Sequence, residues 1–188
     1  MGSRFRYTHR VRRLLLCALC ACLPVAVRAT VLIPIEFREL VTAASVIAHG
    51  RVTDVHGEWT DGRRSVETLV TVDVSDYLKG NLGPTLTIHV PGGRVGRYRT
   101  VFVGAPEFRA GDEVVLFLRA NRIVGLSQGA FRVVPDSQSG RPTVASPIVM
   151  SINPDVPEAV VRGDSRRKPV AFDTFRDAVR QVISGAGR

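Results

Sequence analysis

The chain has 188 residues, of which 45% are hydrophobic, 6% aromatic and 23% charged, and its formal net charge is +9. This length suits one modest domain and leaves no room for a two-domain enzyme. The apolar fraction supports a packed core, and 17 Gly with 11 Pro are too few for a collagen-like repeat or a wholly disordered chain.

The first 29 residues have the three-part pattern of a secretory signal peptide. Five arginines come first, an apolar run of 14 residues follows, and Val27-Arg28-Ala29 ends in a small residue. We predict cleavage between Ala29 and Thr30, and therefore a periplasmic or secreted protein. The apolar run contains Pro24 and is shorter than the roughly 20 residues of a membrane span. We therefore expect no transmembrane segment in the mature chain.

Two other export routes remain open for this segment. Arg12-Arg13 before three leucines fits a twin-arginine signal, which exports an already folded chain. Leu19-Cys20-Ala21-Cys22 resembles a lipoprotein box, in which Cys22 would be acylated and would begin the mature protein. Ordinary secretion is the prediction, because no cofactor explains folding before export and a cysteine fits poorly two places before the lipidated residue.

Removal of this segment changes the charge and the chemistry of the chain. It contains 6 of the 26 basic residues and none of the 17 acidic ones, so 20 basic and 17 acidic residues remain, a net charge of +3. That small charge argues against nucleic acid as the partner, because nucleic-acid-binding domains carry a concentrated basic face. All three cysteines also leave, which excludes a disulfide framework, a thiolate metal site and a cysteine nucleophile.

The mature chain is expected to begin with a short helix and to continue as strands. Phe37, Leu40, Val41 and Ala44 recur at helical spacing and predict about two helical turns over 36–44. Alternating residues predict a first strand over 45–55 and a longer second strand over 66–75. Between these strands we expect a polar loop that contains Trp59.

Turn residues and apolar runs continue to alternate as far as residue 135. We expect a turn over 77–84, where Gly and Pro are frequent. Further strands are expected at 86–90, 99–103, 114–118, 123–126 and 130–134. The run 114–118 is apolar throughout, which predicts a strand covered on both faces. Short strands at this spacing predict a barrel or a sandwich.

The end of the chain divides into a linker and a helix. Residues 136–170 are rich in Ser, Pro and Gly, and we expect a loop or linker after a β-barrel domain of residues 30–135. A C-terminal amphipathic helix is predicted over 171–188, with Asp173 as its N-cap. Its helically spaced apolar residues are Phe172, Phe175, Val179, Val182 and Ile183. We expect it to pack on its own domain, with docking on a partner as the alternative.

No residue set in the mature chain predicts catalysis. Gly125-Leu126-Ser127-Gln128-Gly129 matches the G-x-S-x-G pattern, but all three mature histidines precede Ser127, whereas hydrolases of that class place the histidine after it. Gly163-Asp164-Ser165 resembles the surroundings of a protease serine, but it lacks the glycines that shape the oxyanion hole. We therefore predict a protein that is not an enzyme, has no cofactor, and uses Ser127 in a turn between strands.

Two histidines raise the question of a metal site. His49 and His89 fall on the predicted outward faces of strands, where they could be cross-strand neighbours. Zinc normally needs three or four protein ligands, and no third ligand at convincing spacing follows from the sequence. We therefore predict no metal site.

The best candidate contact surface is the segment 92–99 together with Trp59. This segment combines flexible glycines, three arginines and one aromatic ring. Such a loop suits an anionic ligand or single-stranded nucleic acid, with arginine on phosphate and tyrosine stacking. An ordinary surface loop is the alternative. The candidate partner-binding residues are Trp59, Arg94, Arg97, Tyr98 and Arg99.

Several segments occur in an order known from other proteins. Ser45 to Val52, Tyr77-Leu78-Lys79-Gly80 and Gly111 to Leu118 resemble the netrin-like module of tissue inhibitors of metalloproteinases. This resemblance implies a five-stranded OB barrel with flanking helices. Those inhibitors use an N-terminal cysteine to chelate the protease zinc, and that mechanism does not carry over to a cysteine-free chain. Segments 103–108 and 124–131 add a closer similarity to a group of uncharacterised exported bacterial β-barrel proteins.

The sequence therefore predicts a mainly β protein. We expect an OB-like barrel, closed or partly open, with a short N-terminal helix and a C-terminal amphipathic helix. The expected role is an exported, non-catalytic binding or accessory module that acts on a protein or an envelope component. A secreted protease inhibitor or protease-associated module is one alternative, and an OB domain that binds an anionic ligand or single-stranded nucleic acid is another. The sequence leaves the oligomeric state open.

Overall fold

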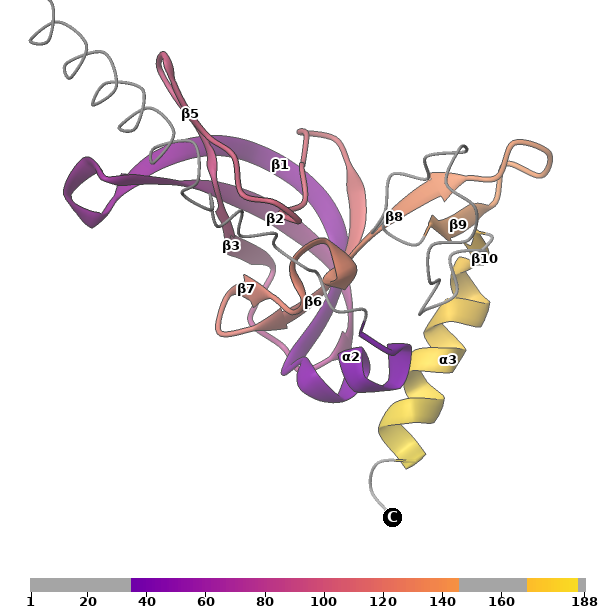
Figure 1. The fold of residues 1–188 in the computed structure, drawn as a ribbon. Helices are drawn as coiled ribbons and strands as arrows, with labels where there is room; N and C mark the ends of the chain where they lie inside the picture. The colour runs from indigo at the N-terminus through magenta and orange to yellow at the C-terminus, as the bar shows by residue number, and fades with distance from the viewer. Residues whose placement is uncertain (1–34, 146–168, 186–188) are drawn as a thin grey trace, which may run out of the picture. The chain divides into compact units, whose positions relative to one another are not determined.

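The computed structural model describes residues 35–145 and 169–185. These residues are mainly β, with a short helix α2 (Phe37–Ala43) before the strands and a longer helix α3 (Phe172–Gly185) after them (Figure 1). Two 3-10 turns lie at Asp61–Arg63 and Leu126–Gly129. The predicted class, mainly β with a helix near each end, is confirmed. The short helix forms because its apolar residues share one face, where Leu40 and Val41 are buried.

Parts of the sequence prediction lie outside the described residues. These are the signal peptide with its cleavage site between Ala29 and Thr30, the lipoprotein cysteine Cys22, and the segment Gly163-Asp164-Ser165. In the ranges that are described, no helix has both the length and the apolar character required to cross a bilayer.

Ten strands are found in the described ranges, and eight of them belong to one sheet. Strands β4 and β5 pair separately with each other. The strands are β1 (Val46–Thr60), β2 (Ser65–Lys79), β3 (Thr85–Pro91), β4 (Gly93–Val95), β5 (Tyr98–Thr100), β6 (Glu113–Arg119), β7 (Arg122–Ile123), β8 (Ala130–Pro135), β9 (Pro142–Ala145) and β10 (Val170–Ala171).

Five strands pair in a circuit. Strand β1 pairs with β2, β2 with β3, β3 with β7 and β7 with β6, and β6 pairs again with β1. Every pairing in the circuit is antiparallel except that of β3 with β7, which is parallel and joins His89 to Arg122. Register shifts between β1 and β2 occur near Ile47, His49 and Val52. Such bulges bend a strand, which helps β1 to pair with both β2 and β6.

The inward side chains of the circuit form a first core. Alternate residues of β2 and β3 are buried there, including Val70, Val72 and Ile88. Gly50 of β1 allows β2 to approach closely, because a Cβ atom at this position would lie 2.3 Å from the carbonyl oxygen of Asp73. The predicted alternation in the first three strands therefore corresponds to real burial.

Strand β6 contributes to two cores. Its residues Val114, Leu116 and Leu118 face the first core, whereas Val115 and Phe117 on the opposite face enter a second one. The second core also contains Leu40, Val41, Ala44, Ile47, Phe131, Val133, Val144, Phe175 and Val179. The prediction that this apolar strand is covered on both faces is confirmed.

Strands β8, β9 and β10 extend the sheet beyond the circuit and lead into α3 (Figure 1). The ring centroids of Phe37 and Phe175 lie 5.6 Å apart, and helix α3 packs on its own domain as predicted. Asp173 is not the N-cap, because β10 runs directly into α3 and the helix already begins at Phe172. Strand β9 lies in a segment without periodicity, and its pairing with β8 holds it in place.

Strands β1 and β2 are longer than predicted and continue past the circuit as a two-stranded arm. Strand β1 extends to Thr60, so Trp59 lies in a strand and not in the expected polar loop. Strand β2 extends to Lys79, through part of the turn expected at 77–84. The loop prediction was wrong because polar side chains can face solvent on either side of a two-stranded ribbon, so polarity does not mark its end. The turn was expected to begin too early, because residues 77–79 still pair with Ile47 and Ala48 at the start of β1, and the glycines and proline follow only from Gly80 onward.

Two other predicted strands are shorter in the structure. Strand β5 ends at Thr100, and Val101–Val103 have no strand pairing. Strand β7 ends at Ile123, because Gly125 with a φ of 67° and Leu126 with a φ of 58° turn the chain into a 3-10 turn. Left-handed backbone of this kind cannot continue a strand.

Candidate binding surface

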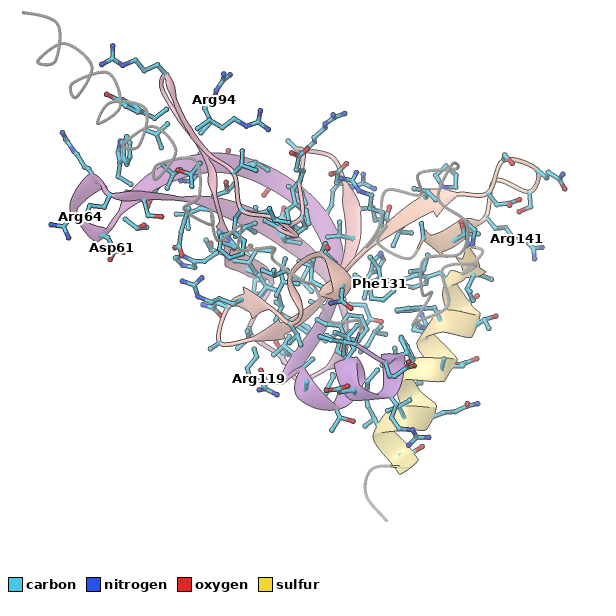
Figure 2. All side chains as sticks on the ribbon, in the orientation of Figure 1. Asp61, Arg64, Arg94, Arg119, Phe131 and Arg141 are labelled. Atoms are coloured by element: carbon cyan, nitrogen blue, oxygen red, sulfur yellow. The ribbon has the colours of Figure 1, made fainter. Side chains whose placement is uncertain are left out.

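The β4–β5 hairpin crosses the arm formed by β1 and β2. A Cβ atom on Gly57 would lie 2.1 Å from the carbonyl oxygen of Arg94, so the two backbones meet directly at this point. Figure 2 shows Arg94 near this crossing, with Arg64 and Asp61 at the tip of the arm. The glycine therefore fixes where the hairpin lies on the arm.

This crossing brings Trp59 and Tyr98 together. Their ring centroids are 5.3 Å apart, and the planes meet edge to face at 66°. The guanidinium carbon of Arg97 lies 5.2 Å from the Tyr98 ring centroid, and its Nη2 donates to the Tyr98 hydroxyl at 3.1 Å. The structure thus joins the tryptophan and the arginine-rich segment that the sequence singled out.

The arginines of this hairpin are exposed. Arg94 on β4 and Arg99 on β5 are register partners, and neither forms an ion pair with a described residue. Their charge is available to a partner. We call Trp59, Arg94, Arg97, Tyr98 and Arg99 the arginine–aromatic surface.

The arm also carries carboxylates close to this surface. Asp54 and Glu58 both contact His56, through Nδ1 and Nε2 respectively, and all three side chains are at least half exposed. The hydrogen bond to Asp54 raises the pKa of His56 above its usual 6.5. The arm is therefore mixed in charge, whereas the β4–β5 hairpin carries only positive charge.

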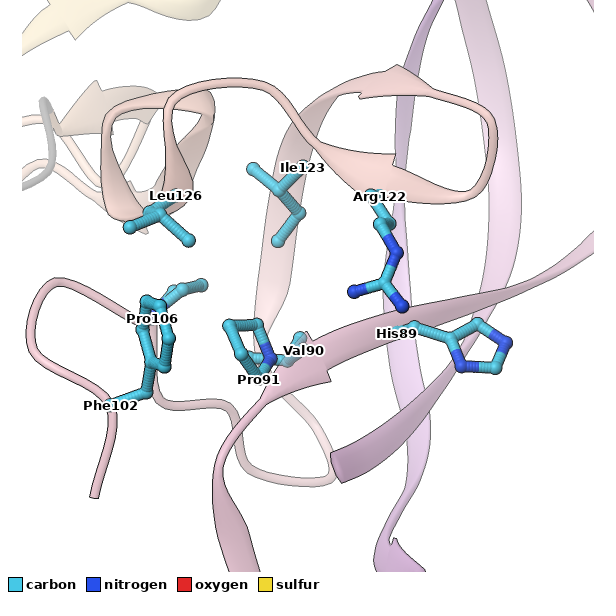
Figure 3. Close-up of a pocket in the computed structure, with 8 residues that line it drawn as sticks. All are labelled: His89, Val90, Pro91, Phe102, Pro106, Arg122, Ile123 and Leu126. Atoms are coloured by element: carbon cyan, nitrogen blue, oxygen red, sulfur yellow. The ribbon is translucent and has the colours of Figure 1, made fainter. Parts of the chain in front are cut away.

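Next to the arginine–aromatic surface, Val101–Val103 form an exposed apolar segment between two cavities. The exposed fractions of Val101, Phe102 and Val103 are 69%, 49% and 58%. The larger cavity, about 310 Å³, lies between the end of β3, β7 and the 3-10 turn at Leu126 (Figure 3). The smaller one, about 240 Å³, extends toward β4 and β5. Phe102 and Pro106 line both cavities.

One end of the larger cavity is polar. His89 and Arg122 line this end (Figure 3). Glu67 of β2 binds both of them. Arg122 Nη2 donates to Oε1 of Glu67 at 2.8 Å, and His89 Nδ1 lies 3.2 Å from Oε2. The Arg122 hydrogen bond lowers the pKa of Glu67 below its usual 4.5, partial burial opposes this, and His89 reinforces it. This trio ties β2, β3 and β7 together where the circuit closes.

The two candidate zinc histidines lie apart in the structure. His49 on β1 contacts Glu113, with 2.8 Å between Nε2 and Oε1, whereas His89 contacts Glu67. Strand β2 lies between their strands. Within the described part of the chain, no three His, Cys, Asp or Glu side chains gather closely enough to hold a metal ion.

Ser127 lies in the 3-10 turn that separates β7 from β8. Its backbone N–H donates to the carbonyl oxygen of Gly104 at 2.9 Å and so links this turn to the loop before β6. The turn expected between two strands is present. Gly125 stands just before this turn with a φ of 67°, in the left-handed region that favours glycine, so this glycine has a structural role.

Sequence reasoning missed the exposed apolar segment and the cavities beside it. The triplet Val101-Phe102-Val103 is a short apolar run with β-branched residues, which predicts a strand whether the side chains are buried or exposed. The two cavities depend on Phe102 and Pro106 meeting the end of β3, which are contacts between distant segments. A bracketing Gly104 was the only hint that the strand would stop early.

Comparison of the chain with models of protein families, with curated proteins and with solved structures finds no match. The similarity to netrin-like modules and to exported bacterial β-barrel proteins therefore stays a prediction.

Proposed function

We propose that this chain is an exported, non-catalytic binding module built on an OB-like barrel. The five-strand circuit with helices packed outside it supports the barrel, because OB-like barrels have this composition of elements. Such barrels commonly present a binding face and not a catalytic one. Export is supported by the signal-like pattern that ends at Ala29.

The partner that the geometry favours is a protein. The observation that carries this proposal is the contact of Trp59 on β1 with Tyr98 on the exposed β4–β5 hairpin. Arg97 packs over the Tyr98 ring and donates a hydrogen bond to its hydroxyl group. Tryptophan, tyrosine and arginine are the residues most enriched among the energetically dominant positions of protein interfaces. Their mutual contacts hold the side chains in place before binding, which reduces the entropy lost when a partner is bound.

The same contacts disfavour single-stranded nucleic acid. A base needs a free aromatic face on which to stack, and Arg97 and Trp59 already pack against the Tyr98 ring. Asp54 and Glu58 on the same arm would also repel phosphate groups. A protein surface with mixed charge suits this arrangement better.

Affinity capture with the full chain as immobilised bait tests the proposal. Envelope and secreted fractions are passed over the wild type, over an Arg97→Gln/Tyr98→Ser variant, and over an Arg141→Gln/Leu82→Ser control. The control also removes one exposed arginine and one exposed large apolar side chain, but from loops outside this hairpin. We expect one stoichiometric protein on the wild type and on the control, and its loss from the first variant.

Other outcomes change the conclusion in defined ways. Equal retention by all three baits, or no retained protein on a folded bait, contradicts the proposal. A protease as the retained protein would establish the protease-associated alternative. A hydrolase activity of the chain that disappears in Ser127→Ala would contradict the non-catalytic role.

The export proposal has its own test. N-terminal sequencing of the protein recovered from the periplasm or medium should begin at Thr30. A mature chain that begins at an acylated Cys22 would establish the lipoprotein route instead, and an intact Met1 would contradict export with cleavage.

A further inference from the structure

The apolar segment Val101–Val103 has the features of an unpaired strand edge. It follows β5 directly, its three side chains are exposed, and two of them are β-branched. None of the three backbone N–H groups donates a hydrogen bond to a described residue, and the carbonyl group of Phe102 accepts one from Ala105 at 3.1 Å. Native proteins usually protect such an edge with charge, proline or a cover, because it is a template for another strand.

The two cavities adjoin each other beside this segment. Side chains two positions apart on a strand share a face and are separated by about 6.6 Å. Phe102 lines both cavities, so they adjoin at this residue. Val90, Pro91 and Pro106 belong to the walls of both, and the wall of the larger cavity is largely apolar, whereas that of the smaller one is apolar on one part and carries Thr68, Arg99 and Arg109 on another. Adjoining cavities of this kind can take alternate side chains of one extended peptide.

The charges around the segment indicate the character of the partner. Arg99 and Arg109 line the smaller cavity, are exposed, and form no ion pair with a described residue. One carboxylate, Glu107, also lines this cavity. Arg94 and Arg97 lie farther along the same hairpin. The positive charge dominates, so acidic residues in the partner are favoured and a second copy of this arginine-rich edge is disfavoured.

We propose that Val101–Val103 bind an extended peptide segment of a partner protein as an added strand. Two apolar side chains of the peptide, two residues apart, enter the two cavities, and flanking Asp or Glu residues lie near Arg99 and Arg109. This inference rests on the proposed protein-binding function and names the chemistry of the partner. Strand addition derives affinity from backbone hydrogen bonds and specificity from pockets for alternate side chains.

A library of phage-displayed random nonapeptides, selected on the full chain, supplies the probe. Enriched peptides should share two apolar residues at positions i and i+2, flanked by Asp or Glu. The best peptide is then made in two N-methylated forms, each blocking one alternate set of backbone amides. Methylation of one set should weaken binding by about tenfold or more, and methylation of the other should leave it nearly unchanged. Equal effects from both sets, or enriched peptides without this pattern, would overturn strand addition.

Variants of the chain locate the site. Val101→Asp adds a negative charge at an exposed position and should weaken binding of the acidic peptide by about tenfold or more, measured by fluorescence anisotropy. Leu82→Asp, which introduces the same charge at another exposed apolar residue away from the cavities, is the control and should have no effect. Arg99→Glu should weaken binding of the acidic peptide and strengthen binding of a form whose acidic residues are replaced by lysine. Unchanged binding in both edge variants would overturn the inference.

The result separates this inference from the proposed function. Partner capture that depends on Arg97 and Tyr98 but not on Val101 would leave the protein-binding role intact and refute strand addition. Capture that depends on Val101 but not on Arg97 and Tyr98 would confirm binding at Val101–Val103 and refute partner binding by the arginine–aromatic surface. A wild-type dimer that Val101→Asp converts to a monomer in sedimentation would identify a second copy as the occupant and overturn the inference.

Discussion

The ammonium group of Lys79 lies 2.6 Å from the carbonyl oxygen of Ala44 and 2.8 Å from that of Val41. These carbonyl groups belong to the C-terminal end of α2, where they lack partners within the helix. Lys79 is the last residue of β2, so a single side chain joins the short helix to the sheet. A cation at this end of a helix also interacts favourably with the helix dipole.

Replacement of Lys79 by methionine should therefore destabilise the protein by about 1.5–3 kcal/mol, the usual range for hydrogen bonds to a charged group. The free energy of unfolding from urea titration is the measurement. Arg63→Met removes a cation from an exposed position with no ion pair among the described residues, and it should have almost no effect. Equal losses in both variants would mean that net charge, and not the contact with α2, matters.

Gly57→Ala should move the β4–β5 hairpin away from the arm. The new methyl group would meet the carbonyl oxygen of Arg94, so the hairpin has to shift and Trp59 loses its contact with Tyr98. Trp59 is the single tryptophan of the chain, and its fluorescence emission should move to longer wavelength. Gly185→Ala adds the same methyl group where the nearest atom, on the Arg38 side chain, is 4.0 Å away, and it should leave the spectrum unchanged.

The Glu67 carboxylate should make stability depend on pH in the acid range. Its pKa is lowered in the folded state, mainly by Arg122, so its contribution to stability is present above pH 4.5 and is lost as the pH falls below that value. In Glu67→Gln the free energy of unfolding should fall less between about pH 5 and about pH 3 than in the wild type. Glu39→Gln, an exposed change on α2, should keep the wild-type slope.

Phe175→Ala should release helix α3 from the second core. Phe175 is 6% exposed and its ring lies 5.2 Å from that of Phe131, so truncation leaves a cavity between the helix and the sheet. We expect a loss of about 3–5 kcal/mol in the free energy of unfolding and faster amide exchange along α3. Thr174→Ala, at an exposed neighbouring position, should change neither quantity by a comparable amount.

The sequence correctly predicted those elements in which the spacing of the apolar residues matches the spacing of the buried positions. The short helix, the first three strands, the doubly covered run of β6 and the packed face of the last helix all carry apolar residues at the spacing of their own structure. Sequence reasoning failed where a neighbour in space decides the outcome. Strand β9 exists because β8 pairs with it, and Val101–Val103 stay unpaired although they resemble a strand.

The candidate site shows the same division. Residue type identified Trp59 and Tyr98 as candidates, but their contact depends on the close crossing at Gly57, which no short-range pattern encodes. The hydrogen bond of Arg122 to Glu67 joins residues 55 positions apart in the chain. Contacts over such separations follow from the pairing of strands, and one sequence does not reveal that pairing.

The pairing of β1 with β6 also has a consequence for how the chain folds. Ser45 Oγ donates to the carbonyl oxygen of Leu118 across 73 positions of sequence, and β6 lines both cores. A growing chain therefore cannot complete either core before β6 has emerged. Such high contact order is typical of folding times of milliseconds to seconds. A fragment that ends at Asp112 should therefore remain unfolded, because it lacks the strand that both cores share.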